Sequence, residues 1–373
     1  MFERVFKLSE HKTTVKTEVM AGITTFMTMA YILAVNPSVL GSTGMDTTAV
    51  LLATALASCL GTLCMAFMAN LPFALSAGMG LNAFMAYTVV AGYGYSWQVA
   101  LLAVFIEGLI FIVLSLTNIR EAIFNAIPLT LKKGVSVGIG LFIAFIGLQN
   151  SGLCVDSATL VGIISFPENF HTAGICALLT LIGLFFTAVF YTRKMKGAIL
   201  YGILLTWILG MLCQVTGLYV PTPDAGFYSL FPSWGMTDFS KLGLTFGQCF
   251  NVDFSAVGIV NFIVVIFSFL FVDIFDTLGT LIGVATKAKM LDKDGKLPGI
   301  KPALLADSIA TSAGAILGTS TTTTFVESAS GVAVGGRTGL TALVTGILFL
   351  VSTLFAPIFT AIPSFATAPA LIM

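Results

Sequence analysis

Carboxylates occur within apolar stretches of this sequence, where a charged side chain is costly. Asp273 and Asp276 lie in FSFLFVDIFDTLGT, three positions apart, so a helix would place them on one face. Glu327 follows the polar run GTSTTTTF at 318–325. The apolar stretches around these three residues contain no Lys or Arg to balance their charge. Their side chains are therefore candidates for binding a polar solute or for carrying a proton.

Two further acidic residues, Glu107 and Asp307, lie in other apolar stretches. We expect a local structural role for Glu107. Asp307 lies near one end of its stretch, which leaves an interfacial carboxylate and a functional group equally open.

The motif GMGLNA at 78–83 fits the GxGxxA pattern of dinucleotide-binding folds. That pattern needs a soluble strand–helix unit and an acidic residue about 20 positions further on. No acidic residue occurs between Asn70 and Trp97, and apolar stretches lie on both sides. We therefore reject a nucleotide site at this motif.

The composition is that of an all-α polytopic membrane protein. Of 373 residues, 57% are hydrophobic and only 9% are charged, whereas soluble proteins carry roughly 25% charged residues. A net charge of zero gives no reason to expect a nucleic-acid partner. The two His and six Cys lack zinc-ligand spacing, so no metal site is expected.

Apolar stretches long enough to cross a bilayer, or nearly so, recur along the whole chain. We predict spans at 18–40, 48–69, 73–91, 98–117, 128–150, 172–191, 197–216, 256–282, 302–318, 320–334, 338–357 and 361–373. The third and tenth of these differ from the rest. Each begins with a strand-like or polar segment and continues through glycine into a short helix.

Basic residues predict the orientation, because they gather in cytoplasmic loops. With a cytoplasmic N-terminus, every Lys and Arg except Lys241 falls on the cytoplasmic side. We expect a multi-pass protein of the cytoplasmic membrane.

An internal repeat relates the two halves of the chain. The segment GLIFIVLSLTNIREAIFNAIP at 108–128 is similar to GILFLVSTLFAPIFTAIP at 346–363. This match aligns span four with span eleven, and the same offset of seven aligns the two unusual spans. An odd offset inverts the second copy, and inverted repeats with interrupted spans are typical of secondary transporters. A complete second half would need two more spans, so we expect this sequence to be part of a longer chain.

The two unusual spans predict a central site. Extended backbone in a membrane must pair inside the protein or line a polar cavity. We therefore expect residues 73–77 and 320–326 to lie extended and adjacent at mid-membrane depth. Glu327 would then stand at the start of one short helix and Asn82 early in the other, beside unpaired N–H groups.

These segments resemble the AzgA-like purine permeases, a branch of the nucleobase–cation symporters. The resemblance covers nearly the whole chain and rests on stretches such as TTVKTEVMAGITTFMTMAYILAVNPSVL, GMGLNAFMAYTVV, FVDIFDTLGTLIGVATKAKMLDKDGKLP and STTTTFVESASGVAVGGRTGLTA. It implies a fold of fourteen spans in 7+7 inverted repeats, of which this chain would hold about twelve.

The resemblance also implies a division into a core domain, which holds the site, and a moving gate domain. The expected parts are a cytoplasmic N-terminus (1–17), core spans 1–4 (18–117), gate spans 5–7 (128–216), an extracellular loop (217–255), core spans 8–11 (256–357) and the start of gate span 12 (361–373).

The function implied is proton-coupled uptake of purine bases such as adenine, guanine or hypoxanthine. By motif position the substrate contacts fall on Asn82, Asp273 and Glu327, with Asp276 close by. Phe325 or Phe275 could stack on the base. Asp273 is the expected proton carrier, and Asp276 could share the proton. The only coupling partner expected is H⁺, without a cofactor, and a homodimer stays open because related transporters are often dimers.

The sequence departs from the resembled family at LSAGMG, where many members have a proline before the glycine, and at Glu107, where a small polar residue is common. Three alternatives stay open: an anion transporter of the same architecture, a channel, and, more remotely, an intramembrane aspartyl protease. Two central carboxylates disfavour an anionic substrate. A protease dyad needs carboxyls from two helices, whereas Asp273 and Asp276 share one.

Overall fold

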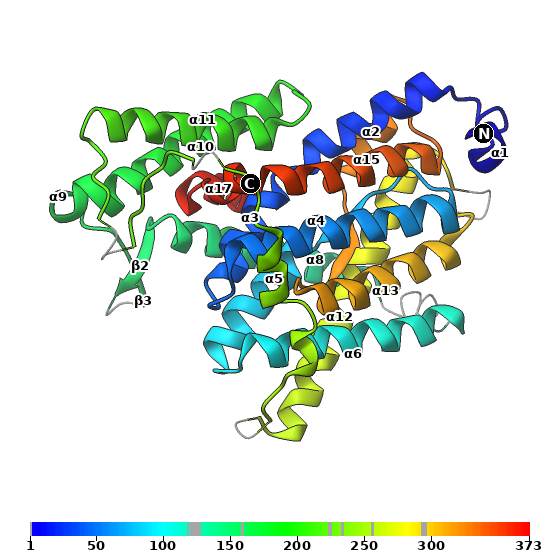
Figure 1. Ribbon diagram of the computed structural model, residues 1–373, viewed down its shortest axis with the longest axis horizontal. Coiled ribbons are helices and arrows are strands. Elements are labelled where there is room, and N and C mark those ends of the chain that lie inside the picture. Colours follow the sequence, from blue (N-terminus) through cyan, green and yellow to red (C-terminus); the bar gives the residue numbers. More distant parts are fainter. Residues whose placement is uncertain are drawn as a thin grey trace.

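The computed structural model is built almost entirely of helices that run roughly side by side (Figure 1). It describes residues 2–117, 119, 128–157, 160–222, 226–232, 235–254, 257–291 and 297–373. Residues 118 and 120–127, in the first copy of the predicted repeat, lie outside the described residues. So do residues 223–225, 233–234 and 255 of the predicted 217–255 loop, the first residue of the predicted 256–282 span, and residues 292–296 of the basic loop.

One group of helices contains both halves of the predicted core. It comprises α2 (Val15–Met29), α4 (Thr47–Cys64), α6 (Trp97–Leu116), α12 (Ile259–Ala288), α13 (Ile300–Leu317) and α15 (Gly339–Ser352). Helix α13 packs on α6 and α4, while α15 packs on α2 and α4. Small residues allow these close contacts, since a side chain at Gly108 would collide with Ser312 of the facing helix.

A second group combines α8 (Leu129–Asn150), α10 (Ile175–Thr192), α11 (Ala198–Val215) and α17 (Ser364–Ile372). Helices α10 and α11 interlock through two reciprocal pairs, in which Thr206 fills the space over Gly183 and Thr187 fills the space over Gly202. Helix α17 packs on the other three although it begins about 150 residues after the end of α11 and still further from α8 and α10. In Figure 1, α10, α11 and α17 lie to the left of the first group.

Short elements connect the long helices. They are α1 (Phe2–Phe6), α3 (Ile32–Gly41), η1 (Met65–Ala69), η2 (Phe84–Gly92), α9 (Phe166–Asn169), η3 (Phe170–Gly174), η5 (Phe239–Leu244), η6 (Gln248–Phe250), η7 (Thr353–Phe355) and α16 (Ala356–Thr360). A hairpin of β2 (Cys154–Ser157) and β3 (Leu160–Ile163) follows α8. The sequence analysis assigns no strand there.

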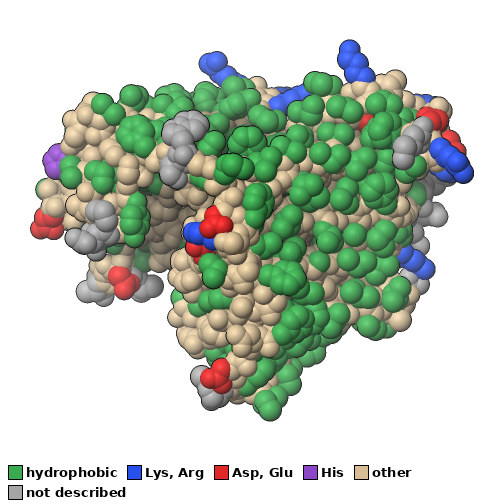
Figure 2. Space-filling view, in the orientation of Figure 1, with side chains coloured by type: hydrophobic (Ala, Val, Ile, Leu, Met, Phe, Trp, Pro, Cys, Tyr) green, Lys and Arg blue, Asp and Glu red, His purple; other side chains and the backbone are tan. Residues whose placement is uncertain are grey.

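The apolar character predicted for the chain is present in the structure. Among the described residues, eight helices are long and apolar enough to cross a membrane. Two apolar segments, Met79–Gly92 and Gly140–Asn150, are shorter. Hydrophobic side chains cover most of the face in Figure 2, and the few charged ones lie mostly near its margins.

The third and tenth predicted spans are interrupted as expected. Strand β1 (Leu75–Ala77) pairs antiparallel with β4 (Thr322–Thr324), with Ser76 opposite Thr323. A short helix follows each strand: α5 (Met79–Ala83) after β1 and α14 (Ser328–Val334) after β4. Both strands are buried, so their backbone groups pair inside the protein. The prediction of two adjacent extended segments is confirmed.

The first predicted span contains a break that the sequence analysis does not anticipate. Helix α2 ends at Met29, and α3 begins at Ile32. Just before the break, the Thr28 hydroxyl donates to the backbone oxygens of Thr24 and Thr25, and the Thr24 hydroxyl donates to that of Met20. Such bonds from Thr back to the preceding turn bend helices.

Candidate functional site

Strand β4 and the start of the helix that follows β1 form one wall of a cavity of about 150 Å³. The cavity lies where β1 pairs with β4, a place called here the β1–β4 crossing. The cavity is lined from several elements, including Tyr31 at the α2–α3 break, Met79 of α5, Asp276 of α12, and Phe325 and Glu327 after β4. Ligand sites commonly combine apolar walls with a few convergent polar groups. This lining brings two carboxylates, one phenol and one aromatic ring to a single small cavity.

Glu327 occupies the N-cap position of the short helix α14, at the helix start predicted for it, without a side-chain capping hydrogen bond. Its Oε1 accepts a hydrogen bond of 2.7 Å from the hydroxyl of Tyr31, whose side chain is buried. Tyr31 occupies the break between α2 and α3, so the bend places the phenol beside the carboxylate. The sequence analysis misses Tyr31; a hydroxyl-bearing aromatic inside an apolar span is the signal that could have found it.

The two aspartates of α12 have different surroundings. Asp276 lines the cavity, with its Oδ2 near the position that a side chain at Gly78 would occupy. Asp273 does not line the cavity and is fully buried. Its Oδ1 accepts a 2.8 Å hydrogen bond from Thr277 Oγ1. A separation of three residues turns the two side chains far enough apart for only one to reach the cavity.

Asn82 and Phe275 make their contacts outside the cavity lining. Asn82 is buried, and its Oδ1 accepts a hydrogen bond from the Ser320 hydroxyl, which ties α5 to the segment before β4. Phe275 packs edge-on against Phe271, with ring centroids 4.8 Å apart. Neither side chain lines the 150 Å³ cavity, whereas Phe325 does.

Two further buried acids, Glu107 and Asp307, hold the threonine run in place. Thr321 donates to Glu107 Oε2 at 2.9 Å, a contact of the structural kind expected for Glu107. The backbone N–H of Thr324 donates to Asp307 Oδ1 at 3.2 Å. Asp307 is fully buried and bonded to this strand, so the choice left open above falls against an interfacial carboxylate.

Larger cavities lie elsewhere. One of about 490 Å³ is lined by Gln149, Tyr219 and Phe365 among others and contains no carboxylate. Another, of about 590 Å³, is lined by Lys194 and Glu327 among others. Glu327 therefore borders both this large cavity and the small one at the crossing. Among the described residues, no group of His, Cys, Asp and Glu is arranged to hold a metal ion.

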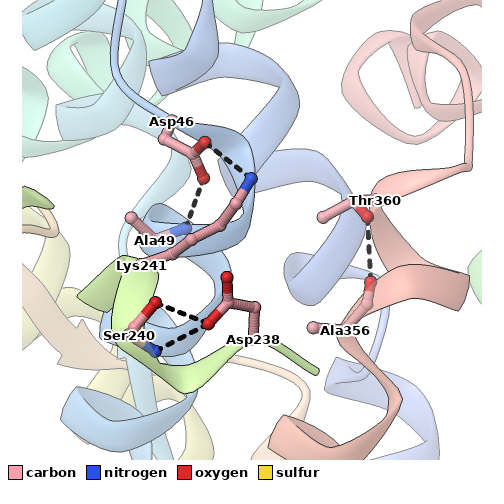
Figure 3. Close-up of polar contacts among 7 residues, drawn as sticks. All are labelled: Asp46, Ala49, Asp238, Ser240, Lys241, Ala356 and Thr360. Atoms are coloured by element: carbon pink, nitrogen blue, oxygen red, sulfur yellow. Dashed lines mark hydrogen bonds and ion pairs between the residues drawn. The ribbon is translucent and has the colours of Figure 1, made fainter. Parts of the chain in front are cut away.

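An ion pair fastens the loop before α12 to the start of α4 (Figure 3). Lys241 on η5 donates to Asp46 Oδ2 at 3.0 Å, and Asp46 Oδ1 caps α4 by accepting from the Ala49 N–H. Burial opposes the charge on Asp46, but the hydrogen bonds from Ala49 and Lys241 outweigh it and lower the pKa of this carboxyl. Hydrogen bonds from the Ser240 hydroxyl and N–H likewise lower the pKa of Asp238.

Comparison with known proteins shows the family to which this chain belongs. A model described as the permease family matches residues 16–373. This chain belongs to that family. The permease is 46% identical over 378 residues to the guanine/hypoxanthine permease PbuG of Bacillus subtilis, covering 99% of this chain and 81% of that protein. It is 42% identical over 376 residues to the adenine permease AdeP of Escherichia coli, covering 100% of this chain and 79% of that protein.

Solved structures agree on the fold. The permease superposes on the transmembrane domain of the cyanobacterial bicarbonate transporter BicA with a TM-score of 0.65, at 16% identity, over 95% of this chain and 86% of that one. It superposes on murine Slc26a9, an anion transporter, with a TM-score of 0.61 at 13% identity, over 95% of this chain and 59% of that one. At such identities the likeness concerns the fold alone, which is that of inverted-repeat transporters.

Family membership makes the permease a multi-pass membrane transporter and not an enzyme. The resemblance to purine permeases inferred from the sequence is confirmed, and the intramembrane protease alternative falls with it.

Proposed function

We propose that this permease carries purine nucleobases into the cell together with protons, across the cytoplasmic membrane and with its N-terminus in the cytoplasm. The supporting observation is the convergence of Glu327, Asp276, Tyr31 and Phe325 on the cavity at the β1–β4 crossing. Relatives that match the chain along nearly its whole length are named for adenine, guanine and hypoxanthine.

The chemistry of the cavity suits a purine. A purine base is flat and neutral, with N–H donors on its edge and a broad aromatic face. Carboxylate oxygens accept from such donors, and an aromatic ring such as Phe325 can stack on the face. Tyr31 holds Oε1 of Glu327, which leaves Oε2 to accept from the base.

The roles predicted from the sequence are adjusted by this geometry. Glu327 keeps the role of principal base-binding carboxylate, and Asp276 takes the second contact in place of Asp273 because Asp276 lines the cavity. Asn82 acts through Ser320 by holding the crossing together. Phe275 could stack on the base only in a state in which α12 has moved.

Alternating access would come from motion between the two groups of helices. The gate predicted at 128–216 and 361–373 corresponds to α8, α10, α11 and α17, which pack on one another. Glu327 borders both the cavity at the crossing and the larger cavity beside Lys194. A residue in this position can meet the base from either side as the gate moves. A homodimer is compatible with this scheme, which does not require one.

An anion transporter is the main alternative, because BicA and Slc26a9 share the fold. Two carboxylates line the cavity at the crossing, and no Lys or Arg is among its described lining residues. Carboxylates repel an anionic substrate, so the site favours a neutral base.

Uptake of radiolabelled hypoxanthine, with adenine, guanine, xanthine and uracil as competitors, tests the proposal. We expect saturable uptake that a protonophore abolishes and that purines inhibit better than uracil. Non-saturable flux would identify a channel, and bicarbonate or sulfate transport without purine uptake would identify an anion transporter. Either result contradicts the proposal.

A further inference from the structure

Two buried aspartates from neighbouring helices meet at one hydroxyl group. Thr277 Oγ1 lies 2.8 Å from Asp273 Oδ1, 3.1 Å from Asp307 Oδ2 and 2.7 Å from Thr323 Oγ1. All four side chains are at most 1% exposed. Asp273 and Asp307, called here the aspartate pair, belong to α12 and α13, and neither lines the cavity.

The hydrogen bonds around this hydroxyl are all satisfied when the pair carries one proton. A hydroxyl has one hydrogen to donate and two lone pairs with which to accept. Thr277 can therefore donate to only one of the two carboxyl groups. An oxygen of the other carboxyl group then faces a lone pair of Thr277 Oγ1 at hydrogen-bond distance. This contact is favourable when that carboxyl carries a hydrogen and donates it to Thr277. With the Thr323 hydroxyl on the second lone pair, every group around Thr277 is satisfied.

The aspartate pair is one strand away from the cavity. Thr323 and Thr324 line the cavity. From the same strand, the Thr323 hydroxyl reaches Thr277, and the Thr324 N–H donates to Asp307. A change of charge on the pair therefore acts directly on β4, which forms the cavity wall.

We propose that the coupling proton resides on the Asp273–Asp307 pair, bridged by Thr277, and not on the base-binding carboxylates. This proposal rests on the proposed function and specifies how it is coupled. A proton from water outside the cell binds to the anionic pair and is shared between the two carboxyl groups through Thr277. After the base leaves on the inside, that proton passes to cytoplasmic water. Two anionic carboxylates then face one hydroxyl and repel each other, which separates α12 from α13 and shifts β4.

Other titratable groups surround the pair. Among the described side chains on elements packed against α12 and α13, they are Glu107 on α6, Glu327 at the start of α14, Cys59 and Cys64 on α4, and Cys249 on η6, while Asp276 and Lys301 lie on α12 and α13 themselves. Glu107 is a matched control, because it also accepts a hydrogen bond from a threonine of the same run, Thr321, but lies outside the pair.

The test compares Asp273→Asn, Asp307→Asn and Glu107→Gln with the wild type in proteoliposomes. Counterflow of labelled hypoxanthine needs no proton gradient, whereas accumulation driven by a pH gradient does. In both Asn variants we expect counterflow within about threefold of wild type, gradient-driven accumulation reduced at least tenfold, and no acidification of the lumen. Glu107→Gln should keep both activities. Asn variants that still accumulate base and acidify the lumen would overturn the inference.

A second pair of variants and a direct readout cover the case in which an Asn variant does not fold. Thr277→Ser keeps the bridging hydroxyl and should keep the pH dependence of uptake, whereas Thr277→Val should shift it. Infrared spectroscopy of wild type should show a protonated-carboxyl band that Thr277→Val shifts and Glu107→Gln leaves in place. An unchanged band and pH profile in Thr277→Val contradict the inference. Absence of purine counterflow in wild type is a separate outcome, which overturns the proposed function and the inference that rests on it.

Discussion

The two segments that meet at the crossing share a backbone plan and differ in their side chains. In β1, residues Leu75–Ala77 are mostly apolar, and the neighbouring helix α4 supplies polar partners through Ser58 and Thr62. In β4, residues Thr322–Thr324 bring their own hydroxyls and lie against buried carboxylates. The inverted repeat therefore duplicates the scaffold, while the chemistry is concentrated in the second copy.

The carboxylates that line the cavity and those of the aspartate pair follow the same division. Asp273, Asp276, Asp307 and Glu327 all belong to the second half, on α12, α13 and the start of α14. The first half contributes the phenol of Tyr31 and the glycine that lets β1 approach β4. Substitutions in the second copy should therefore remove chemistry, and those in the first should disturb its position.

The largest effect is expected from Glu327→Gln. The substitution keeps the size of the side chain and removes the charge that accepts from the base. A lost hydrogen bond to a charged group costs about 1.5–3 kcal/mol, which corresponds to roughly ten- to a hundredfold in apparent affinity. The concentration dependence of labelled hypoxanthine uptake, normalised to protein in the membrane, measures this loss of apparent affinity. Wild-type affinity in this variant would remove Glu327 from the site.

A steric change in the first copy comes next. A Cβ at Gly78 would lie 2.9 Å from Thr323 Cγ2 and 3.2 Å from Asp276 Oδ2. Overpacking of this kind costs about 1–3 kcal/mol, so Gly78→Ala should lower uptake about tenfold.

A second substitution provides the control for that prediction. Thr323→Ser removes Cγ2 but keeps the hydroxyl, so the double variant Gly78→Ala/Thr323→Ser should regain most of the lost uptake. If the effects of the two substitutions simply add, contact between β1 and β4 is not the cause.

Tyr31→Phe should have a smaller effect. It removes the 2.7 Å hydrogen bond to Glu327 Oε1 and leaves the ring in its buried position. We expect apparent affinity to fall by up to about tenfold, with about 0.5–1.5 kcal/mol lost, and the maximal rate to change little. Tyr31→Phe combined with Glu327→Gln should be no worse than Glu327→Gln alone. A full additive loss would show that Tyr31 acts independently of Glu327.

The smallest effect is expected far from the crossing, at the ion pair of Figure 3. Lys241→Met should lower thermal stability in detergent by about 0.2–1 kcal/mol and leave uptake unchanged. Because the folded state lowers the pKa of Asp46, the contribution is present at neutral pH and is lost as pH falls through that lowered pKa. A stability difference that persists in strong acid would contradict this assignment.

The sequence predicts the crossing well, because few arrangements allow a threonine run and glycine-rich segments inside lipid-soluble helices. The positions of β1, β4 and Glu327 follow from that constraint alone. The sequence does not predict which aspartate of α12 faces the cavity. Asp273 and Asp276 lie on similar faces of one helix, and packing of α12 on α6 and α14 decides its rotation.

Tyr31 is unpredictable for a different reason. Its place depends on the interruption between α2 and α3 and on the hydroxyl bonds from Thr24 and Thr28 beside it, which are visible only once the backbone is known. Glu18 is a similar case. This buried carboxylate accepts from the backbone N–H groups of Arg337 and Thr338, over 300 residues away in the sequence.

The central claim is that the purine binds at the crossing, against the second copy of the repeat. A structure of the protein determined with bound hypoxanthine tests it most directly. We expect the base in the 150 Å³ cavity, with its N–H groups on Glu327 and Asp276 and its face against Phe325. A base found in the 490 Å³ cavity beside Gln149 and Tyr219, with the crossing empty, would contradict the claim.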